Sequence, residues 1–150
     1  MYMAIAAAQG VVLGFILKLG LGYSVTNMAL YYGTCVLISM TFTSIILFLI
    51  ENFSDVGKFL CILLLVLQLA ASGGTFPIET VPKFFQSIYA YMPMNYSIRL
   101  IKEALIKTDN GMVGQNAGIL IGILVTFIAI VTIIEFLKQK NKNKAENSET

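Results

Sequence analysis

Two glycines and a proline interrupt an apolar run in the stretch Gln68-Leu69-Ala70-Ala71-Ser72-Gly73-Gly74-Thr75-Phe76-Pro77-Ile78-Glu79. The segment that follows, residues 80–107, is amphipathic and divides at Pro93. Each half is roughly 11–14 residues long, or about 15–20 Å of helix, whereas the hydrocarbon core of a bilayer is about 30 Å thick. Neither half is therefore long enough to cross a membrane.

The composition places the whole chain in a bilayer. Of its 150 residues, 57% are hydrophobic and 12% are charged, and the mean hydropathy is +0.82. A soluble domain carries about 25% charged residues, so this chain has too little polar surface to coat a globule in water. The net charge of +2 gives no argument for a nucleic-acid partner, and we expect none.

The apolar runs predict membrane spans at about residues 1–21, 28–50, 59–76 and 117–137. The third run has few strictly apolar residues, so its helix either extends through Gly73 and Gly74 toward Phe76 or ends at mid-depth against protein. The predicted fold class is all-α: a polytopic membrane helix bundle of four spans. A Pro-broken helical hairpin, at about residues 80–108, precedes the last span.

The hairpin is expected to dip into one leaflet or to lie in the membrane interface. Thr80 is expected to cap its first helix and Asn95 its second. Arg99 and Glu103 stand four residues apart on the polar side of the second helix, where such pairs are weakly stabilising. Three tyrosines of this segment suit the level of the lipid headgroups, namely Tyr89, Tyr91 and Tyr96.

Small residues recur at four-residue spacing in the first and the last span. Gly10 and Gly14 follow Ala6 in the first, and the last carries Gly114, Gly118 and Gly122. This spacing stacks small residues on one helix face, which lets a neighbouring backbone approach closely. Both faces are expected to be helix-packing surfaces, and some of their partners are expected outside this chain.

The basic tail indicates the orientation. Lysines at alternate positions follow the last span, at Lys138, Lys140, Lys142 and Lys144. The positive-inside rule therefore predicts a multi-pass protein of the cell membrane with both termini cytoplasmic, and the composition of residues 138–150 predicts disorder. Four basic residues of the hairpin segment then lie outside, against the rule: Lys83, Arg99, Lys102 and Lys107.

Nothing in the sequence supports an enzyme. Histidine is absent, which removes the commonest general base and metal ligand. Cys35 and Cys61 lie in apolar runs and are expected to be small buried hydrophobes. We expect no cofactor and no metal. The chain has no Walker motif, so any ATP hydrolysis would need a separate partner.

Four elements of the sequence together resemble a known family. They are the apolar run that ends in Gln68–Glu79, the hexapeptide Val81-Pro82-Lys83-Phe84-Phe85-Gln86, the turn Tyr91-Met92-Pro93-Met94-Asn95-Tyr96, and Arg99-Leu100-Ile101-Lys102-Glu103-Ala104. This signature is similar to the C-terminal membrane domain of the YhgE/Pip (phage infection protein) family. More distantly, it resembles the membrane subunits of type-2 ABC exporters.

The resemblance implies a Gram-positive cell-envelope protein with a C-terminal bundle preceded by a further span and a large extracellular region. Some members of the family act as phage receptors, and a related branch works with type VII secretion. We expect this chain to be a piece of such a protein, in which recognition belongs to the part outside it. The expected partners are the bilayer, a second copy or other membrane subunits, and a separate ATPase.

In the exporter interpretation, the hairpin gates the outer side of a path between helices. The candidate hairpin and lining residues are Gln68, Gly73, Gly74, Thr75, Phe76, Pro77, Glu79, Pro93, Asn95 and Arg99. Glu79 and Arg99 are predicted to act as a charge pair, so that reversing either charge impairs assembly or export and swapping both restores it. The alternative is that these residues only cap helices, pack against neighbours and anchor the hairpin.

Three functional hypotheses remain open on the sequence. The first is an export or secretion module of ABC-exporter architecture. The second is an envelope receptor or scaffold that does not transport, and the third is a small holin-like pore. The ordered turn at residues 73–77 disfavours the third, because a lytic pore does not need it.

Overall fold

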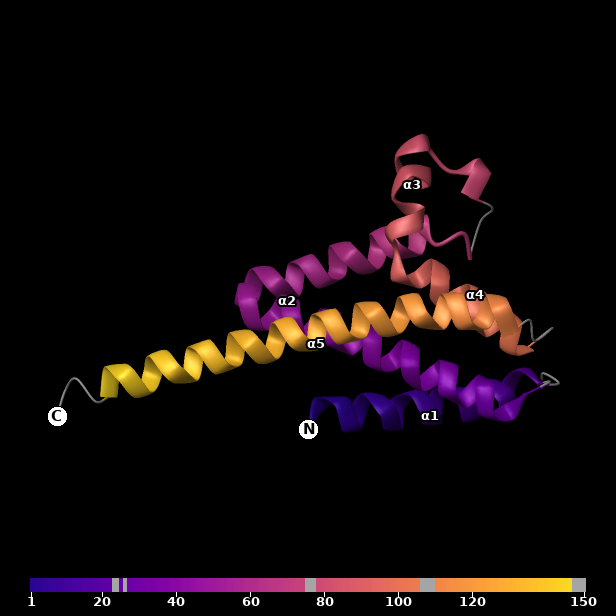
Figure 1. Ribbon diagram of the computed structural model, residues 1–150. Coiled ribbons are helices and arrows are strands. Elements are labelled where there is room, and N and C mark those ends of the chain that lie inside the picture. Colours follow the sequence, from indigo (N-terminus) through magenta and orange to yellow (C-terminus); the bar gives the residue numbers. More distant parts are fainter. Residues whose placement is uncertain (23–24, 26, 75–77, 106–109, 147–150) are drawn as a thin grey trace.

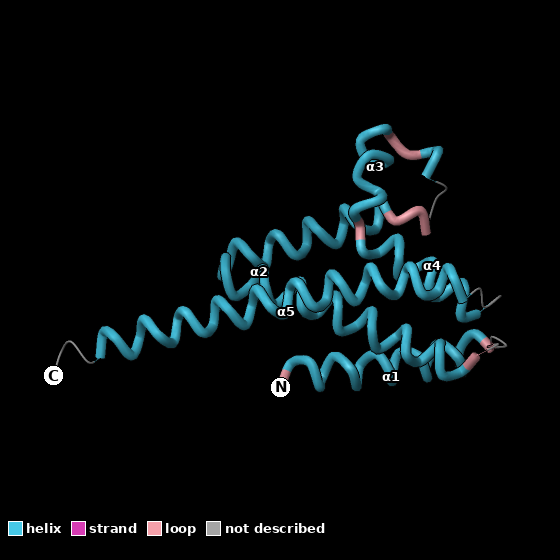
Figure 2. The backbone as a smooth tube through the Cα atoms, in the orientation of Figure 1, coloured by secondary structure: helices cyan, strands magenta, loops and turns pink. Residues whose placement is uncertain are grey.

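The computed structural model describes residues 1–22, 25, 27–74, 78–105 and 110–146, and the elements within them are helices. Three of these helices, α1 (Tyr2–Leu21), α2 (Met28–Ala71) and α5 (Asn110–Glu146), form the long part of the molecule (Figures 1 and 2). The short elements η1 (Ile78–Thr80), α3 (Lys83–Ile88), η2 (Tyr89–Tyr91) and α4 (Pro93–Leu105) lie together near one end of it.

Helix α2 contains the second and the third predicted span. Its backbone leaves helical geometry at Ser54, where φ is 49° and ψ is −118°, and Figure 1 shows the chain reversing there. A Cβ on Gly57 would overlap the carbonyl oxygen of Leu49, so only glycine lets the two halves of α2 meet this closely. The predicted connection at residues 51–58 is thus a tight reversal.

All the other long elements pack on α2. Contacts join it to α1, to α4 and to α5, and Asn27 caps its start by accepting a hydrogen bond from the N–H of Leu30 at 3.1 Å. Hydroxyl groups tie α1 to α2: Ser39 donates to the carbonyl of Ala6 at 2.7 Å and Tyr31 to that of Gly14 at 3.2 Å. Such interhelical bonds suit a bundle that lacks a hydrophobic driving force in lipid.

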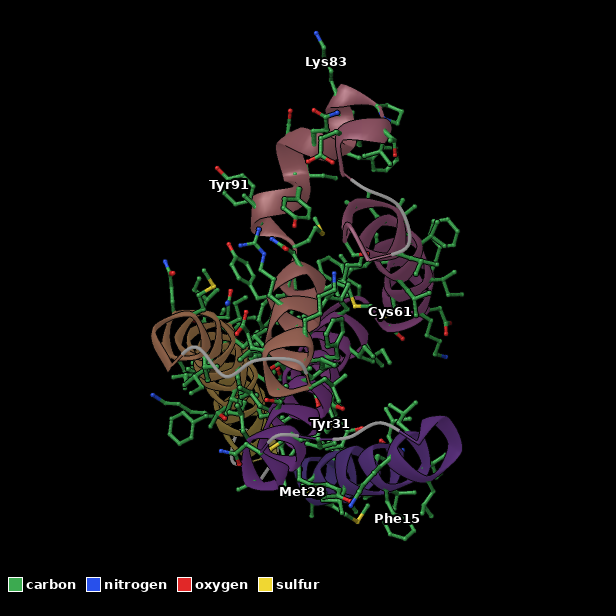
Figure 3. The ribbon with its side chains drawn as sticks, turned by 90° about the vertical axis from the view of Figure 1, so that its right-hand side faces the viewer. Phe15, Met28, Tyr31, Cys61, Lys83 and Tyr91 are labelled. Carbon is green, nitrogen blue, oxygen red and sulfur yellow. The ribbon has the colours of Figure 1, made fainter. Side chains whose placement is uncertain are left out.

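Large apolar side chains lie on the outside of the bundle. Leu19 is 69% exposed and Phe59 is 65% exposed, whereas Thr41 and Ser44 are buried; Figure 3 shows Phe15 pointing outward from α1. The two buried hydroxyls donate to backbone carbonyls of α2 itself. Three described helices are long and apolar enough to cross a membrane, and α2 among them has 44 residues. The fold class, an all-α membrane helix bundle, is confirmed.

Two predicted helix boundaries differ from the structure. The third span ends at Ala71 instead of near residue 76, because Gly73 adopts a φ of +65° that terminates the helix. The last helix, predicted for 117–137 with a disordered tail, runs from Asn110 to Glu146. Once an apolar span has nucleated a helix, adding lysine, glutamine, alanine and glutamate extends it cheaply.

The hairpin differs in two details. Its first helix is short: α3 begins after Pro82, which is the residue at its N-cap, so Thr80 does not occupy the predicted position. Asn95 lies inside α4 and caps nothing, since the helix already begins at Pro93. The predicted break at Pro93 is present, because Met92 is extended between η2 and α4. Helix α4, about 20 Å long, packs against both α2 and α5.

The ends of the helices gather at two opposite ends of the bundle. Met1, Glu51 and Glu135 line one cavity, so the chain's first residue, the approach to the Ser54 reversal and the later part of α5 lie together. The end of α1, the start of α2, α3 and the start of α5 lie toward the opposite end (Figure 1). That the first of these ends faces the cytoplasm stays a prediction.

Candidate functional site

The turn after α2 rests directly on the hairpin. Ser72 donates its hydroxyl hydrogen to the carbonyl of Leu69 at 3.1 Å and accepts the N–H of Gly74 at 3.2 Å. A Cβ on Gly73 would lie 3.0 Å from Cε2 of Tyr89, and one on Gly74 would lie 2.5 Å from Cδ1 of Ile98. The two glycines are therefore needed both for the positive φ of Gly73 and for this close approach.

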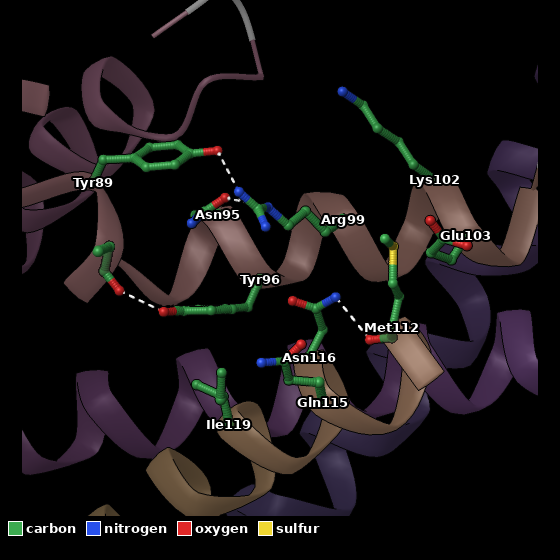
Figure 4. Close-up of a pocket in the computed structure, with 11 residues that line it drawn as sticks. Tyr89, Asn95, Tyr96, Arg99, Lys102, Glu103, Met112, Gln115, Asn116 and Ile119 are labelled. Carbon is green, nitrogen blue, oxygen red and sulfur yellow. Dashed lines mark hydrogen bonds between the residues drawn. The ribbon is translucent and has the colours of Figure 1, made fainter. Parts of the chain in front are cut away.

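Arg99 joins η2 to α4 across the break at Pro93. Its Nε donates to Oδ1 of Asn95 at 3.1 Å, and its Nη2 donates to the hydroxyl of Tyr89 at 3.3 Å (Figure 4). The guanidinium carbon lies 5.9 Å from the centre of the Tyr89 ring, a distance at which a cation and an aromatic face attract each other. Tyr96 adds a second tie by donating to the carbonyl of Ala90 at 2.6 Å.

A cavity of about 440 Å³ lies between η2, α4 and the first turns of α5 (Figure 4). Arg99, Lys102 and Glu103 bring charge to its wall, and Gln115 and Asn116 bring amides. Asn116 is buried and donates to the carbonyl of Met112 at 2.8 Å. We call this space the polar cavity; its full lining is Tyr89, Ala90, Asn95, Tyr96, Arg99, Lys102, Glu103, Met112, Gln115, Asn116 and Ile119.

The side chains of the polar cavity suit the binding of a polar group. Arg99 and Lys102 offer cationic donors beside tyrosine hydroxyls and amides, which is a set that orients a polar or anionic group. Within the described residues, no group of three or more histidine, cysteine, aspartate or glutamate side chains is placed to hold a metal ion.

The structure separates the predicted lining residues. Asn95 and Arg99 line the polar cavity, whereas Gln68 lines a different, apolar cavity. Gly73 and Gly74 form the turn, and Pro93 is buried at the start of α4. Glu79 is exposed in η1. The other three predicted residues, Thr75, Phe76 and Pro77, lie outside the described residues.

The predicted charge pair of Glu79 and Arg99 does not form. Among the described residues the ion pair that the structure shows joins Lys58 to Asp55 at 2.8 Å. Arg99 instead bonds to neutral groups of Asn95 and Tyr89. The reason is local: the break at Pro93 folds η2 back over the first turn of α4, which brings Tyr89 to Arg99.

Sequence reasoning missed the contribution of α5 to the site. Gln115 and Asn116 lie before residue 117, where the last span was expected to start, and neither was among the predicted lining residues. The structure begins α5 at Asn110 and places both amides on the cavity wall. The signal that could have indicated them is a pair of adjacent polar residues, one turn into a helix that follows a basic amphipathic helix.

The two predicted glycine faces differ in whether another helix packs against them. A Cβ on Gly10 would lie 2.8 Å from the carbonyl oxygen of Cys35, and one on Gly14 would lie 3.3 Å from its Sγ, so the first face packs against α2. A Cβ built on Gly114, Gly118 or Gly122 would have no atom of a neighbouring helix within 4 Å among the described residues, so this second face is open.

These features define a membrane helix bundle with a broken helical hairpin and a polar cavity before its last span. Residues 1–106 match the ABC-2 type transporter family, so the chain belongs to that family. It is also 37% identical, over 145 residues, to a protein of Bacillus subtilis (strain 168) described as "Uncharacterized protein YhgE". That alignment covers 96% of this chain and 19% of the relative.

The resemblance to YhgE-like proteins and to ABC-2 permeases is thereby confirmed for the membrane domain. No solved structure matches this chain. Since the chain spans about a fifth of its relative's length, nothing about that protein's other regions transfers to it directly.

Proposed function

We propose that this chain is the membrane-embedded module of an export or secretion system, in which the hairpin of α3 and α4 controls access to the polar cavity. The observation that carries the proposal is the polar cavity itself. It lies beside the Pro93 break, where α4 is held by hydrogen bonds of Arg99 and Tyr96 instead of by a continuous helix. The part of the hairpin before the break, α3 and η2, is attached to α4 in this way and can move while α4 stays packed against α2 and α5.

The partners follow from the family and the shape. A permease of this class works with a separate ATPase, which would engage the end of the bundle that carries the Ser54 reversal, because we place that end in the cytoplasm. The open face of Gly114, Gly118 and Gly122 fits a second copy or another membrane subunit. Participation in type VII secretion would be one specific case of this proposed export function.

The orientation is tested by cysteine labelling. In a variant whose Cys35 and Cys61 are replaced by alanine, Ser87→Cys on the exposed surface of α3 should react with a membrane-impermeant maleimide added outside intact cells. Asn143→Cys should react only after the cells are permeabilised. Labelling of Asn143→Cys in intact cells would reverse the orientation and remove the external gate.

Export is tested by comparing what cells release with and without the gene. Deletion should deplete a component of the extracellular fraction, and the parent gene should restore it. Arg99→Leu should fail to restore it, because the hydrogen bond from α4 to Tyr89 of η2 is lost. Lys83→Leu is the matched control: it removes the same charge from the tip of the hairpin, where the side chain points away from the bundle (Figure 3).

The receptor hypothesis has a distinct outcome in the same cells. If the bundle only anchors an envelope or phage receptor, deletion should abolish phage adsorption and leave the extracellular fraction unchanged. Arg99→Leu should then behave like the parent protein in both measurements.

A further inference from the structure

Gln68 carries a buried amide that the bundle leaves without an acceptor. The residue is 4% exposed, and its Nε2 has no hydrogen-bond partner in the described part of the chain. A buried donor without an acceptor is unfavourable, and buried polar side-chain atoms in folded proteins nearly always have a partner. The amide therefore indicates an acceptor supplied from outside the chain.

The amide faces an apolar cavity of about 290 Å³. Phe42 and Ile45 of the first half of α2 form one wall, Leu64 and Leu65 of its second half form the other, and Met94 of α4 completes the lining. We call this space the apolar groove. Apart from the weakly polar thiol of Cys61, Gln68 carries the polar side chain of this lining, so the occupant has to be apolar over most of its surface.

The apolar groove opens to the outside of the bundle. Three of its lining side chains lie at the surface: Ile46 is 42% exposed, Leu65 is 63% exposed and Leu69 is 54% exposed. In a membrane this surface meets lipid tails. Water is a poor occupant, because an ordered buried water typically makes about three hydrogen bonds and Gln68 offers the polar contact here.

Gln68 also lies at the depth where lipids carry an acceptor. It precedes Ala71, the last residue of α2, by three positions, or about 5 Å along the helix. The second half of α2, residues 55–71, is about 25 Å long, close to the hydrocarbon thickness of about 30 Å. Gln68 is thus near one edge of the hydrocarbon core, and the ester carbonyls of membrane lipids lie at that edge.

We propose that the apolar groove binds one acyl chain of a membrane lipid, and that Nε2 of Gln68 donates a hydrogen bond to the ester carbonyl of that chain. The bound lipid fills the space between the two halves of α2 and supplies the acceptor that the described residues lack. Because Met94 belongs to the first turn of α4, the lipid also contacts the hairpin beside the Pro93 break. The proposal does not depend on whether the protein transports.

The test compares two lipids that differ only in the carbonyl. The purified full-length protein in detergent is mixed with equal amounts of a diacyl phosphatidylcholine and its dialkyl ether analogue of the same chain length. Lipid retention is measured by native mass spectrometry. The parent protein should retain the ester lipid several-fold more than the ether lipid, and Gln68→Leu should retain the two equally. Gln9→Leu, which removes an exposed glutamine of α1, should keep the preference.

A second measurement separates lipid binding from folding. Without lipid, Gln68→Leu should melt at the same temperature as the parent or higher, because it removes an unsatisfied donor. Ester lipid should raise the melting temperature of the parent and of Gln9→Leu more than ether lipid does, and should lose this advantage in Gln68→Leu. Gln68→Met, closer in shape to glutamine, replaces the leucine variant if that one fails to accumulate.

Three outcomes would overturn the proposal. The first is equal retention of the two lipids by the parent protein, and the second is an ester preference that survives in Gln68→Leu. The third is loss of an oligomer in Gln68→Leu without any lipid preference in the parent, which would make a second copy the occupant. None of these results bears on export, so the proposed function stands or falls separately.

Discussion

Helices α1 and α5 both carry glycines four residues apart, and the bundle uses the two faces differently. On α1, a Cβ at Gly10 would lie 2.8 Å from both the carbonyl oxygen of Cys35 and the Cα of Val36, so backbone meets backbone there. On α5, Gly118 has no such neighbour within 4 Å among the described residues. The same spacing is thus a closed contact in one helix and an open surface in the other.

The polar groups around the two faces account for the difference. Beside the α1 glycines, hydroxyls of α2 bond across to the carbonyls of Ala6 and Gly14. On α5, Thr126 and Thr132 bond back to carbonyls of their own helix at 2.8 Å. Small residues permit close approach, whereas interhelical hydrogen bonds select which neighbour makes it. A glycine matters to the chain's own stability only where a neighbouring backbone occupies the place of its Cβ.

The largest effect is expected at Gly57, where that condition is most extreme. A Cβ there would overlap the carbonyl oxygen of Leu49, and both belong to the Ser54 reversal, which cannot open without unpacking the two halves of α2. Gly57→Ala should destabilise the protein by about 3 kcal/mol or more, measured by unfolding in mixed micelles. Gly33→Ala, also in α2 but with open space around it, is the control. Equal stability of the two variants would contradict the comparison.

A smaller loss of stability is expected at the α1 face, and the loss should be larger at Gly10 than at Gly14. Gly10→Ala should cost about 1–3 kcal/mol, because the new methyl group meets backbone atoms of α2 that cannot move independently. Gly14→Ala should cost less, since its methyl would meet side-chain atoms of Cys35 and Tyr32 at 3.3 Å, which can shift. The same unfolding measurement checks both, and the reverse order would show that side chains, not backbones, set the α1–α2 distance.

The smallest effect on stability is expected at the α5 face. Gly118→Leu should leave the free energy of unfolding nearly unchanged, because Gly118 is exposed and a Cβ there has no neighbour within 4 Å among the described residues. If this face meets a second copy or another subunit, the variant should associate several-fold less in native-membrane crosslinking. Ala8→Leu places the same side chain at an exposed position of α1 and should not affect association. A loss of stability in Gly118→Leu alone would mean that the face is already packed within the chain.

Some features of the hairpin and the polar cavity could be predicted from the sequence and others could not. The break at Pro93 was correct, because proline acts on the backbone locally. For Gly73 and Gly74, the sequence left open whether the third helix ends there or runs on to about residue 76, and the structure ends it at Ala71. The partner of Arg99 was not, since the prediction chose Glu79 on charge alone. The structure instead brings Tyr89 to Arg99, a contact set by how η2 folds back on α4.

The surroundings of Gln68 also could not be predicted from the sequence. The sequence predicted Gln68 to line the path beside the hairpin, with packing against neighbouring helices as the alternative. The buried amide without a partner and the apolar groove around it emerge only when the two halves of α2 and the start of α4 are placed in space.

Taken by itself, the sequence determined that the chain is an all-helical membrane protein and where the hairpin breaks. These properties follow from hydrophobicity, proline and glycine, which act over a few neighbouring residues. The tertiary structure alone decided which glycine face is closed, what Arg99 holds, and that Gln68 and Asn95 line different cavities. Those outcomes depend on which helices meet and at what height, and no spacing within a single helix encodes the position of another.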